Sequence, residues 1–179
     1  MVPVARRALE TERLRLEPIG SAHVSGLVQA TVDSRPELLP WMPWAVSPSL
    51  DAVRDNVRHA EQGWLDDRVY HFAVVDAVGG RVLGVAGLNR DGPDSAELHY
   101  WIRSDHAGRG LATEAGRALV AWAPGALGVR RLTLWAGREN HASRRVAARL
   151  GFVHLGPLGW RPEGGQGTFE AESYELELT

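Results

Sequence analysis

Short segments of alternating hydrophobic and polar residues run through this chain, and such alternation predicts strands with one buried face. The first strand is expected where Leu14 and Leu16 alternate with arginines, and the last is expected over 168–178. The Gly79-Gly80 pair predicts a hairpin turn within a meander of three strands. The remaining strands are predicted over 70–76, 81–89, 96–103, 131–136 and 152–160.

Apolar residues recur at helical spacing in the intervening segments. A helix that begins at Leu111 is expected to end at Pro124 and Gly125, while Ser47 or Ser49 is the expected N-cap of another. The Pro- and Trp-rich segment 36–48 lies between the first two helices. The other helices are predicted over 21–31, 49–66 and 141–150, the last closed by Gly151. Together with the strands, this order of elements predicts an α+β fold built on a mixed sheet.

Composition narrows the class of protein. At 179 residues, with 44% hydrophobic and 23% charged residues, the chain fits one globular domain over 1–179. A formal net charge of −2 provides no basic surface for nucleic acid, and no apolar run approaches the ~20 residues of a membrane-spanning helix. The N-terminal MVPVARRALE lacks the apolar core of a signal peptide. We therefore expect a cytoplasmic protein.

Several catalytic chemistries are missing from the sequence. Without cysteine, the chain has no disulfide, thiolate nucleophile or cysteine metal site. The seven histidines are scattered, with no H-E-x-x-H arrangement, so no metal is expected. No Gly-x-Ser-x-Gly motif of a hydrolase occurs either.

The stretch HAGRGLATEAGRA, residues 106–118, places a glycine-rich turn directly before an amphipathic helix. Gly108 and Gly110 allow the main chain to approach a ligand closely, and the start of the helix favours an anion, which indicates a phosphorylated cofactor. A Walker loop is excluded because it needs lysine, whereas all twenty basic residues here are arginines. The dinucleotide fingerprint also fails, since Thr113 stands where a third small residue is required.

The turn 107–112 resembles the pyrophosphate-binding motif Gln/Arg-x-x-Gly-x-Gly/Ala of the GNAT superfamily of acetyl-CoA-dependent N-acetyltransferases. Gly110 and Ala112 match the motif, whereas Ala107 stands in place of its first, polar residue. This substitution removes one polar side-chain contact, but the main-chain groups that form the cradle remain. The resemblance implies contacts to acetyl-CoA from the whole turn: Ala107, Gly108, Arg109, Gly110, Leu111 and Ala112.

Four further segments resemble the ribosomal-protein N-acetyltransferase-like (RimJ/RimL-like) branch of that superfamily. They are TERLRLEPI, LPWMPW, AELHYWI and ENHASRRVAARLGF, and they occur in the family's order. The resemblance spans nearly the whole chain, from Thr11 to Leu178. It implies a mixed, mostly antiparallel central sheet flanked by helices on both faces.

The strand over 96–103 carries the candidate general base. Alternation places one set of residues on one face (Glu97, His99, Trp101 and Arg103) and another on the opposite face (Leu98, Tyr100 and Ile102). A carboxylate or imidazole can take the proton of an amine, directly or through water, so Glu97 is the first candidate and His99 the second. The resemblance supports Glu97, while His99 stands where the motif usually has glycine. A solvated Glu97 and a packed His99 remain the plainer alternative.

Main-chain and capping groups complete the expected site. A fold of this kind splays the strand 96–103 from its neighbour near 131, which leaves the N–H groups around Ile102 free to bind the thioester carbonyl. Asn140 is a good N-cap for the helix that follows it, and the resemblance adds a contact to the pantetheine of CoA.

Ser143 lies on the same side of that helix as Asn140 and is a candidate proton donor to the CoA thiolate. Many GNAT enzymes use a tyrosine for this role, but Ala147 occupies its place, so either Ser143 or water takes the role. The guanidinium groups of Arg109 and Arg144 are expected to strengthen phosphate binding.

The aromatic segment 41–44 is expected to form a wall of the acceptor pocket. Trp41 and Trp44, together with Glu97, suit a cationic amine, although packing in the core is the alternative. We predict transfer of acetyl from acetyl-CoA to a primary amine, at a protein N-terminus or on a small molecule, by direct attack in a ternary complex. Succinyl-CoA or another acyl donor, and a non-catalytic CoA-binding regulatory or interaction protein, remain alternatives. A homodimer is also predicted.

Overall fold

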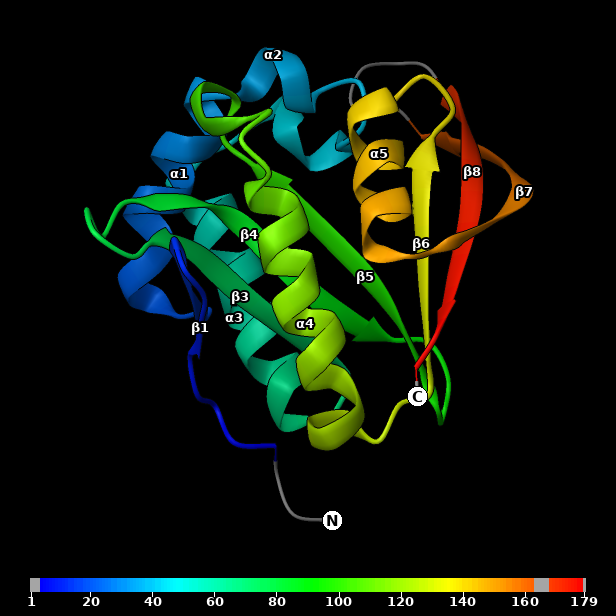
Figure 1. The fold of residues 1–179 in the computed structure, drawn as a ribbon. Coiled ribbons are helices and arrows are strands. Elements are labelled where there is room, and N and C mark those ends of the chain that lie inside the picture. The colour runs from blue at the N-terminus through cyan, green and yellow to red at the C-terminus, as the bar shows by residue number, and fades with distance from the viewer. Residues whose placement is uncertain (1–3, 163–167, 179) are drawn as a thin grey trace.

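The computed structural model describes residues 4–162 and 168–178, and its strands form one eight-stranded sheet in the order β1-β2-β3-β4-β5-β6-β8-β7 (Figure 1). Neighbouring strands are antiparallel, apart from the parallel pair β5 and β6. The mixed, mostly antiparallel sheet is therefore confirmed. The strands are β1 (Leu9–Glu10), β2 (Leu14–Pro18), β3 (Val69–Asp76), β4 (Val82–Arg90), β5 (Ser95–Ile102), β6 (Arg131–Gly137), β7 (Val153–Pro162) and β8 (Thr168–Glu177).

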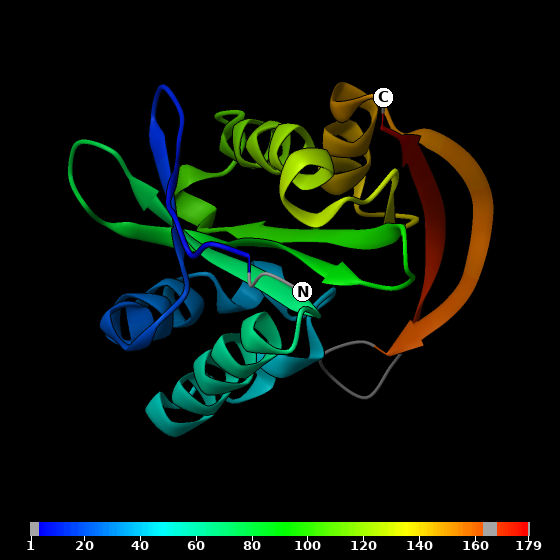
Figure 2. The same ribbon diagram turned by 90° about the horizontal axis from the view of Figure 1, so that it is seen from below.

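Helices cover both faces of the sheet. Figure 2 shows α4 and α5 on one side and α1, α2 and α3 on the other. The α-helices are α1 (Val24–Asp33), α2 (Arg35–Leu38), α3 (Leu50–Leu65), α4 (Leu111–Leu127) and α5 (His141–Leu150). Among the described residues, the short 3₁₀ turns are η1 (Ser21–His23), η2 (Pro43–Val46) and η3 (Ser104–His106). The segment 36–48 thus contains part of α2 and all of η2.

Each face of the sheet has its own hydrophobic core, as alternation along the strands requires. On the α4 and α5 face, Phe72 and Leu98 pack with Leu119 of α4. On the opposite face, Val85 and Trp101 belong to a second cluster with residues of α1 and α3. The β5 side chains therefore alternate between the two cores.

Most predicted helix ends agree with the structure, but the end expected for α4 was wrong. Ser49 caps α3 by accepting from the Ala52 N–H at 3.1 Å. Pro124 and Gly125 do not end α4, which continues to Leu127. The buried Leu127 side chain anchors its last turn, and Gly128 closes the helix with φ 66°, where glycine is favoured.

The parallel pair β5 and β6 is joined over only three residues of each strand. Its register runs from Ser95↔Arg131 to Glu97↔Thr133, and β5 then continues to Ile102 and β6 to Gly137 without further pairing. The two strands diverge towards their carboxyl ends, which opens a gap in the middle of the sheet (Figure 1).

Within 4–162 and 168–178, none of the helices is both long enough and apolar enough to cross a bilayer.

Candidate active site

The gap between β5 and β6 exposes main-chain donors of β5. In an antiparallel ladder, successive residues direct their hydrogen-bonding groups to opposite sides of the strand. The Arg103 N–H donates to the Leu83 carbonyl of β4 at 2.7 Å, so the preceding Ile102 N–H is directed to the side of β6. The β5–β6 ladder has already ended at Glu97, as the predicted divergence requires.

The two catalytic candidates of β5 lie on the face covered by α1 and α3. Glu97 is in register with Asn89 on β4 and Thr133 on β6, and His99 is in register with Gly87. Both share the face of Trp101, as predicted from alternation. Glu97 is partly buried and stands where the β5–β6 ladder ends.

His99 does not stand alone in the structure. Its ring lies 4.3 Å from the ring of His71 on β3, across Gly87, and the His71 Nε2 is 2.9 Å from the Asn89 Oδ1. A Cβ at Gly87 would lie 2.9 Å from the His99 Nε2, so glycine is what allows this close approach. The sequence did not indicate a role for His71 or Asn89. The register of β3, β4 and β5 aligns them with His99, and the hydrophobic pattern of each strand alone does not give that register.

Burial keeps this histidine pair uncharged. The pKa of His99 is held well below its usual range by burial and, secondarily, by His71. Burial also lowers the pKa of His71, although its bond to Asn89 opposes the shift. The His99 Nε2 is buried without a hydrogen-bond partner. Both rings are therefore neutral at pH 7.

Ser143 and Asn140 come together at the start of α5, as the sequence indicated. The Asn140 Oδ1 accepts from the Ser143 N–H at 3.0 Å, which makes Asn140 the N-cap. Tyr100, from the α4 and α5 face of β5, places its hydroxyl 2.9 Å from the Ser143 Oγ. The sequence put Tyr100 on this face but gave no reason to join it to a residue 43 positions away.

The turn 107–112 has the backbone that its glycines predict. Gly108 and Gly110 have φ of 74° and 80°, in the left-handed region that favours glycine, and Gly110 directly precedes α4. The N–H groups in the first turn of a helix have no intrahelical partner, so they are available to an anion. Ala107 is the C-cap of η3, and its N–H donates to the Ser104 carbonyl at 3.1 Å.

Two arginines brace this turn, Arg13 from outside it and Arg109 from within it. Arg13 donates to the Arg109 carbonyl at 3.0 Å and to the Glu114 carboxylate at 2.7 Å. The Arg109 side chain turns back to the Asp105 carbonyl at 3.0 Å. Arg13 was not anticipated, because its only signal was its outward position in the first strand.

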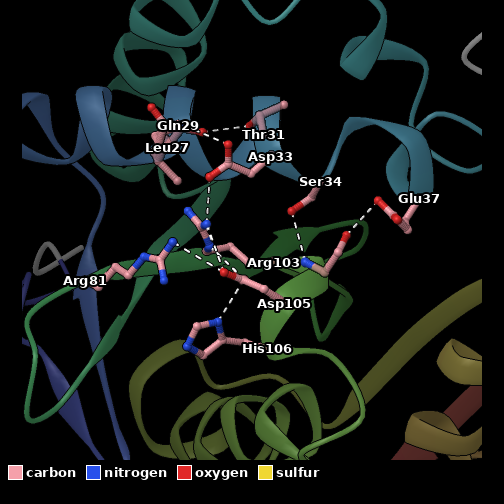
Figure 3. Close-up of polar contacts among 11 residues, drawn as sticks. Leu27, Gln29, Thr31, Asp33, Ser34, Glu37, Arg81, Arg103, Asp105 and His106 are labelled. Atoms are coloured by element: carbon pink, nitrogen blue, oxygen red, sulfur yellow. Dashed lines mark hydrogen bonds and ion pairs between the residues drawn. The ribbon is translucent and has the colours of Figure 1, made fainter.

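A buried arginine ties the end of β5 to the opposite layer. Arg103, with a side chain 3% exposed, binds Asp33 of α1 at 2.7 Å and Asp105 of η3 at 3.0 Å (Figure 3). The guanidinium of Arg103 holds the pKa of Asp105 far below its usual range. Ser104 adds two bonds, from its N–H to Ser34 and from its Oγ to Glu37. The η3 turn before residues 107–112 is thus fixed to α1 and α2.

Arg144 does not point to the expected phosphate site. Its Nε donates to the Tyr174 hydroxyl at 3.0 Å and its Nη1 to the Arg138 carbonyl at 3.1 Å, both within the α5–β6–β8 region. Other arginines flank α4 instead. A cavity of about 520 Å³ beside the helix is lined by Arg13, Gly110, Thr113, Arg117 and Arg149, among others.

Trp41 and Trp44 bridge the open end of the gap on the Glu97 face. Trp41 packs edge-on to Phe169 at 5.4 Å and so close to Gly137, the last residue of β6, that a Cβ there would lie 2.4 Å from its ring. Trp44 lies 5.7 Å from Trp101 of β5 and is 42% exposed. The segment 41–44 thus contacts both arms of the opened sheet.

Three features define a class of protein. They are an anion cradle at the start of α4, main-chain donors at the gap in the sheet, and a carboxylate (Glu97) and a hydroxyl (Ser143) on opposite faces of the sheet. They suit a transferase that holds a phosphate-bearing acyl carrier on one face while an acceptor approaches from the other.

Comparison with known proteins gives the family. Residues 13–153 match the acetyltransferase (GNAT) domain model, so the chain belongs to this family and is an acetyl-CoA-dependent N-acetyltransferase. It is 28% identical over 152 residues to the ribosomal-protein-serine acetyltransferase of Escherichia coli strain K12, covering 83% of each chain.

Solved structures agree on the fold. The ribosomal alpha-N-protein acetyltransferase RimL in complex with coenzyme A superposes with a TM-score of 0.88 at 19% identity, over 96% of this chain and 98% of that one. The microcin self-immunity acetyltransferase MccE, in complex with acetyl-CoA and AMP, gives 0.86 at 15% identity over 93% of both chains.

Proposed function

We propose that the protein acetylates the primary amine at the N-terminus of another protein by direct attack on acetyl-CoA in a ternary complex. The observation that carries this proposal is the placement of Glu97 on one face of the sheet, where the β5–β6 ladder ends, and of Ser143 on the other face, at the start of α5. The amine then approaches from the α1 and α3 face, and the CoA thiol departs towards α5. The ribosomal-protein-serine relative supports a protein acceptor.

The cofactor is held on the α4 and α5 face. Main-chain N–H groups of residues 108–112 bind the pyrophosphate at the start of α4, and Asn140 contacts the pantetheine. The cavity beside α4 receives the phosphate of CoA that is not part of the pyrophosphate. Arg117 and Arg149 line this cavity and are better placed to bind that phosphate than Arg144. These residues need no metal.

The reaction forms a C–N bond and breaks the C–S bond of the thioester. The amine nitrogen attacks the carbonyl carbon while the Ile102 N–H stabilises the developing oxyanion. Glu97 accepts the amine proton, directly or through water, and Ser143 donates a hydrogen bond to the departing sulfur. Trp41 and Trp44 form the wall of the acceptor site and favour a cationic amine.

A Glu97→Gln variant tests the assigned base. We expect kcat/KM to fall at least about 100-fold with CoA affinity unchanged, because the amide cannot take a proton. Thiol release and calorimetry measure the two quantities. Glu177→Gln, which changes an exposed carboxylate on β8, is the control.

His99→Gln separates the two candidate bases. A neutral histidine with a lowered pKa is a weak base, so we expect this variant to retain more activity than Glu97→Gln. The opposite order would transfer the role to His99, and full activity in both variants would leave proton removal to water.

The acceptor and donor are tested with the wild-type protein. Peptides with a free N-terminal amine are expected to be acetylated faster than amino acids, polyamines or aminoglycosides, and acetyl-CoA is expected to outperform succinyl-CoA. A preference for a small amine would overturn the protein-acceptor proposal. CoA binding without turnover of any amine would favour the non-catalytic alternative.

We further propose that residues 1–179 act as one N-acetyltransferase domain in the cytoplasm and associate as a homodimer. Exposed apolar residues on β7, Val153 and Leu155, support an additional contact surface. Light scattering at working concentration measures the mass, and a monomer mass would reject the dimer.

A further inference from the structure

Two hydroxyl groups meet across the cofactor side of the gap. Tyr100 projects from the part of β5 that has lost its pairing with β6, and Ser143 lies in the first turn of α5, which follows β6. Their hydroxyl oxygens are 2.9 Å apart, and the Tyr100 hydroxyl also donates to the Ser143 carbonyl oxygen at 3.3 Å. The bond therefore joins the two elements on either side of the opening.

The Ser143 hydroxyl needs such a partner if its O–H bond is to keep a single orientation. A serine near the start of a helix can rotate and bond to nearby backbone groups instead of facing a ligand. The Ser143 main-chain N–H is already bound by Asn140, which fixes the backbone but leaves the hydroxyl rotor free. Tyr100 supplies a second fixed point, because its ring packs against the core on the α4 and α5 face.

We propose that Tyr100 is a positioning residue for acetyl transfer: its one hydroxyl hydrogen is shared between the Ser143 carbonyl oxygen and the Ser143 Oγ, so that the serine's own O–H is directed at the departing sulfur. This inference rests on the proposed function of Ser143. As the C–S bond breaks, the electron pair stays on sulfur and the amine proton goes to Glu97. Tyr100 itself neither gains nor loses a proton.

The surroundings of Tyr100 keep it a donor. Burial raises the pKa of Tyr100 to about 12, so its hydroxyl remains protonated throughout the neutral range. The nearby Tyr174 hydroxyl accepts a hydrogen bond from Arg144 at 3.0 Å. Tyr174 is therefore a matched control, a second buried phenol of this region whose bond is made to another residue.

A double-mutant cycle tests whether Tyr100 acts through Ser143. We expect Tyr100→Phe to lower kcat about tenfold with the KM for acetyl-CoA unchanged, since one oriented hydrogen bond is lost. Ser143→Ala lowers kcat at least as much, and adding Tyr100→Phe to it has no further effect. Tyr174→Phe retains wild-type kcat. Effects of Tyr100→Phe and Ser143→Ala that multiply would overturn the inference, as would a Tyr100→Phe loss confined to thermal stability or CoA affinity.

A second measurement needs no acceptor. The absorbance of the CoA thiolate, followed against pH in the bound complex, gives the thiol pKa in each variant. A correctly directed Ser143 hydroxyl lowers this pKa, so Tyr100→Phe and Ser143→Ala are both expected to raise it by a similar amount.

The two measurements separate the possible failures. A thiol pKa that rises in Ser143→Ala but is equal in the wild type and Tyr100→Phe would reject the role of Tyr100 and leave the proposed function in place. A wild type that binds no CoA, or acetylates no amine, would reject the proposed function and with it this inference.

Discussion

At the scale of single residues, the site depends on a few polar groups held in apolar surroundings. His71 and His99 make ring contact only because Gly87, between them in the register, has no side chain. Burial depresses the pKa of both histidines, so protonation opposes the folded state. A histidine with a depressed folded pKa contributes stability above its unfolded pKa and loses that contribution as pH falls towards the folded value.

The pH dependence of stability tests this pair. We expect the free energy of unfolding to decrease as pH falls from about 7.5 to 5.5. In this range the two histidines bind protons in the unfolded chain, whereas the buried rings of the folded chain do not. His99→Gln is expected to reduce that decrease by about 1 kcal/mol. Urea denaturation at both pH values measures it, with the exposed His59→Gln as control. Identical pH dependence in the wild type and His99→Gln would contradict the assignment.

At the scale of elements, one buried arginine connects the layers on the two sides of the sheet. Arg103 directly follows β5, and its guanidinium reaches α1 while holding η3, the turn that leads into the anion cradle (Figure 3). The acceptor-side helices and the cofactor turn are therefore positioned by the same residue. Arg81 also contacts Asp105, at 3.4 Å, but half of its side chain is exposed.

Replacing these two arginines separates a buried connection from a surface one. We expect Arg103→Ala to lower the free energy of unfolding by about 3 kcal/mol, because Asp33 and Asp105 lose a partner whose guanidinium is desolvated. Arg81→Ala is expected to cost less than about 1 kcal/mol. Urea denaturation compares the two variants. Equal losses would contradict the importance assigned to Arg103.

At the scale of the whole molecule, the sheet consists of two halves that separate at the gap between β5 and β6, where the proposed reaction takes place. The meander β2 to β5 and the group β6, β8 and β7 share only three paired residues per strand at the β5–β6 boundary. A ligand that contacts both α4, which follows β5, and α5, which follows β6, links the two halves and binds only the folded chain.

Acetyl-CoA is therefore expected to stabilise the protein by mass action. At a concentration about 100 times its Kd, the stabilisation is about 2.7 kcal/mol, which corresponds to a Tm increase of about 5–10 °C for a chain of this size. Differential scanning fluorimetry measures it. Gly110→Ala, which places a side chain at φ 80°, is expected to show a lower Tm and a smaller increase. An unchanged wild-type Tm in millimolar acetyl-CoA would contradict the cradle at residues 107–112.

The sequence by itself determined most of the elements, the faces of β5 and the local motifs, whereas β1 and α2 were not predicted. Alternation placed Glu97 and Tyr100 on opposite faces of β5. Asn140 was identified as the N-cap of a helix, and Gly108 and Gly110 have the left-handed backbone conformation expected of them. These features follow from period, capping chemistry and glycine's freedom at positive φ, all of which operate within a few residues. Pro124 shows the limit, because burial of Leu127 continued a helix that local propensity would have ended.

Only the tertiary structure decided which distant residues meet. The contacts of Arg103 with Asp33, of Tyr100 with Ser143, and of His71 with His99 join residues 70, 43 and 28 positions apart in the numbering. Such pairs depend on strand order and on the point where β5 and β6 separate. A periodic pattern fixes the face of a side chain but carries no information about its partner on another element.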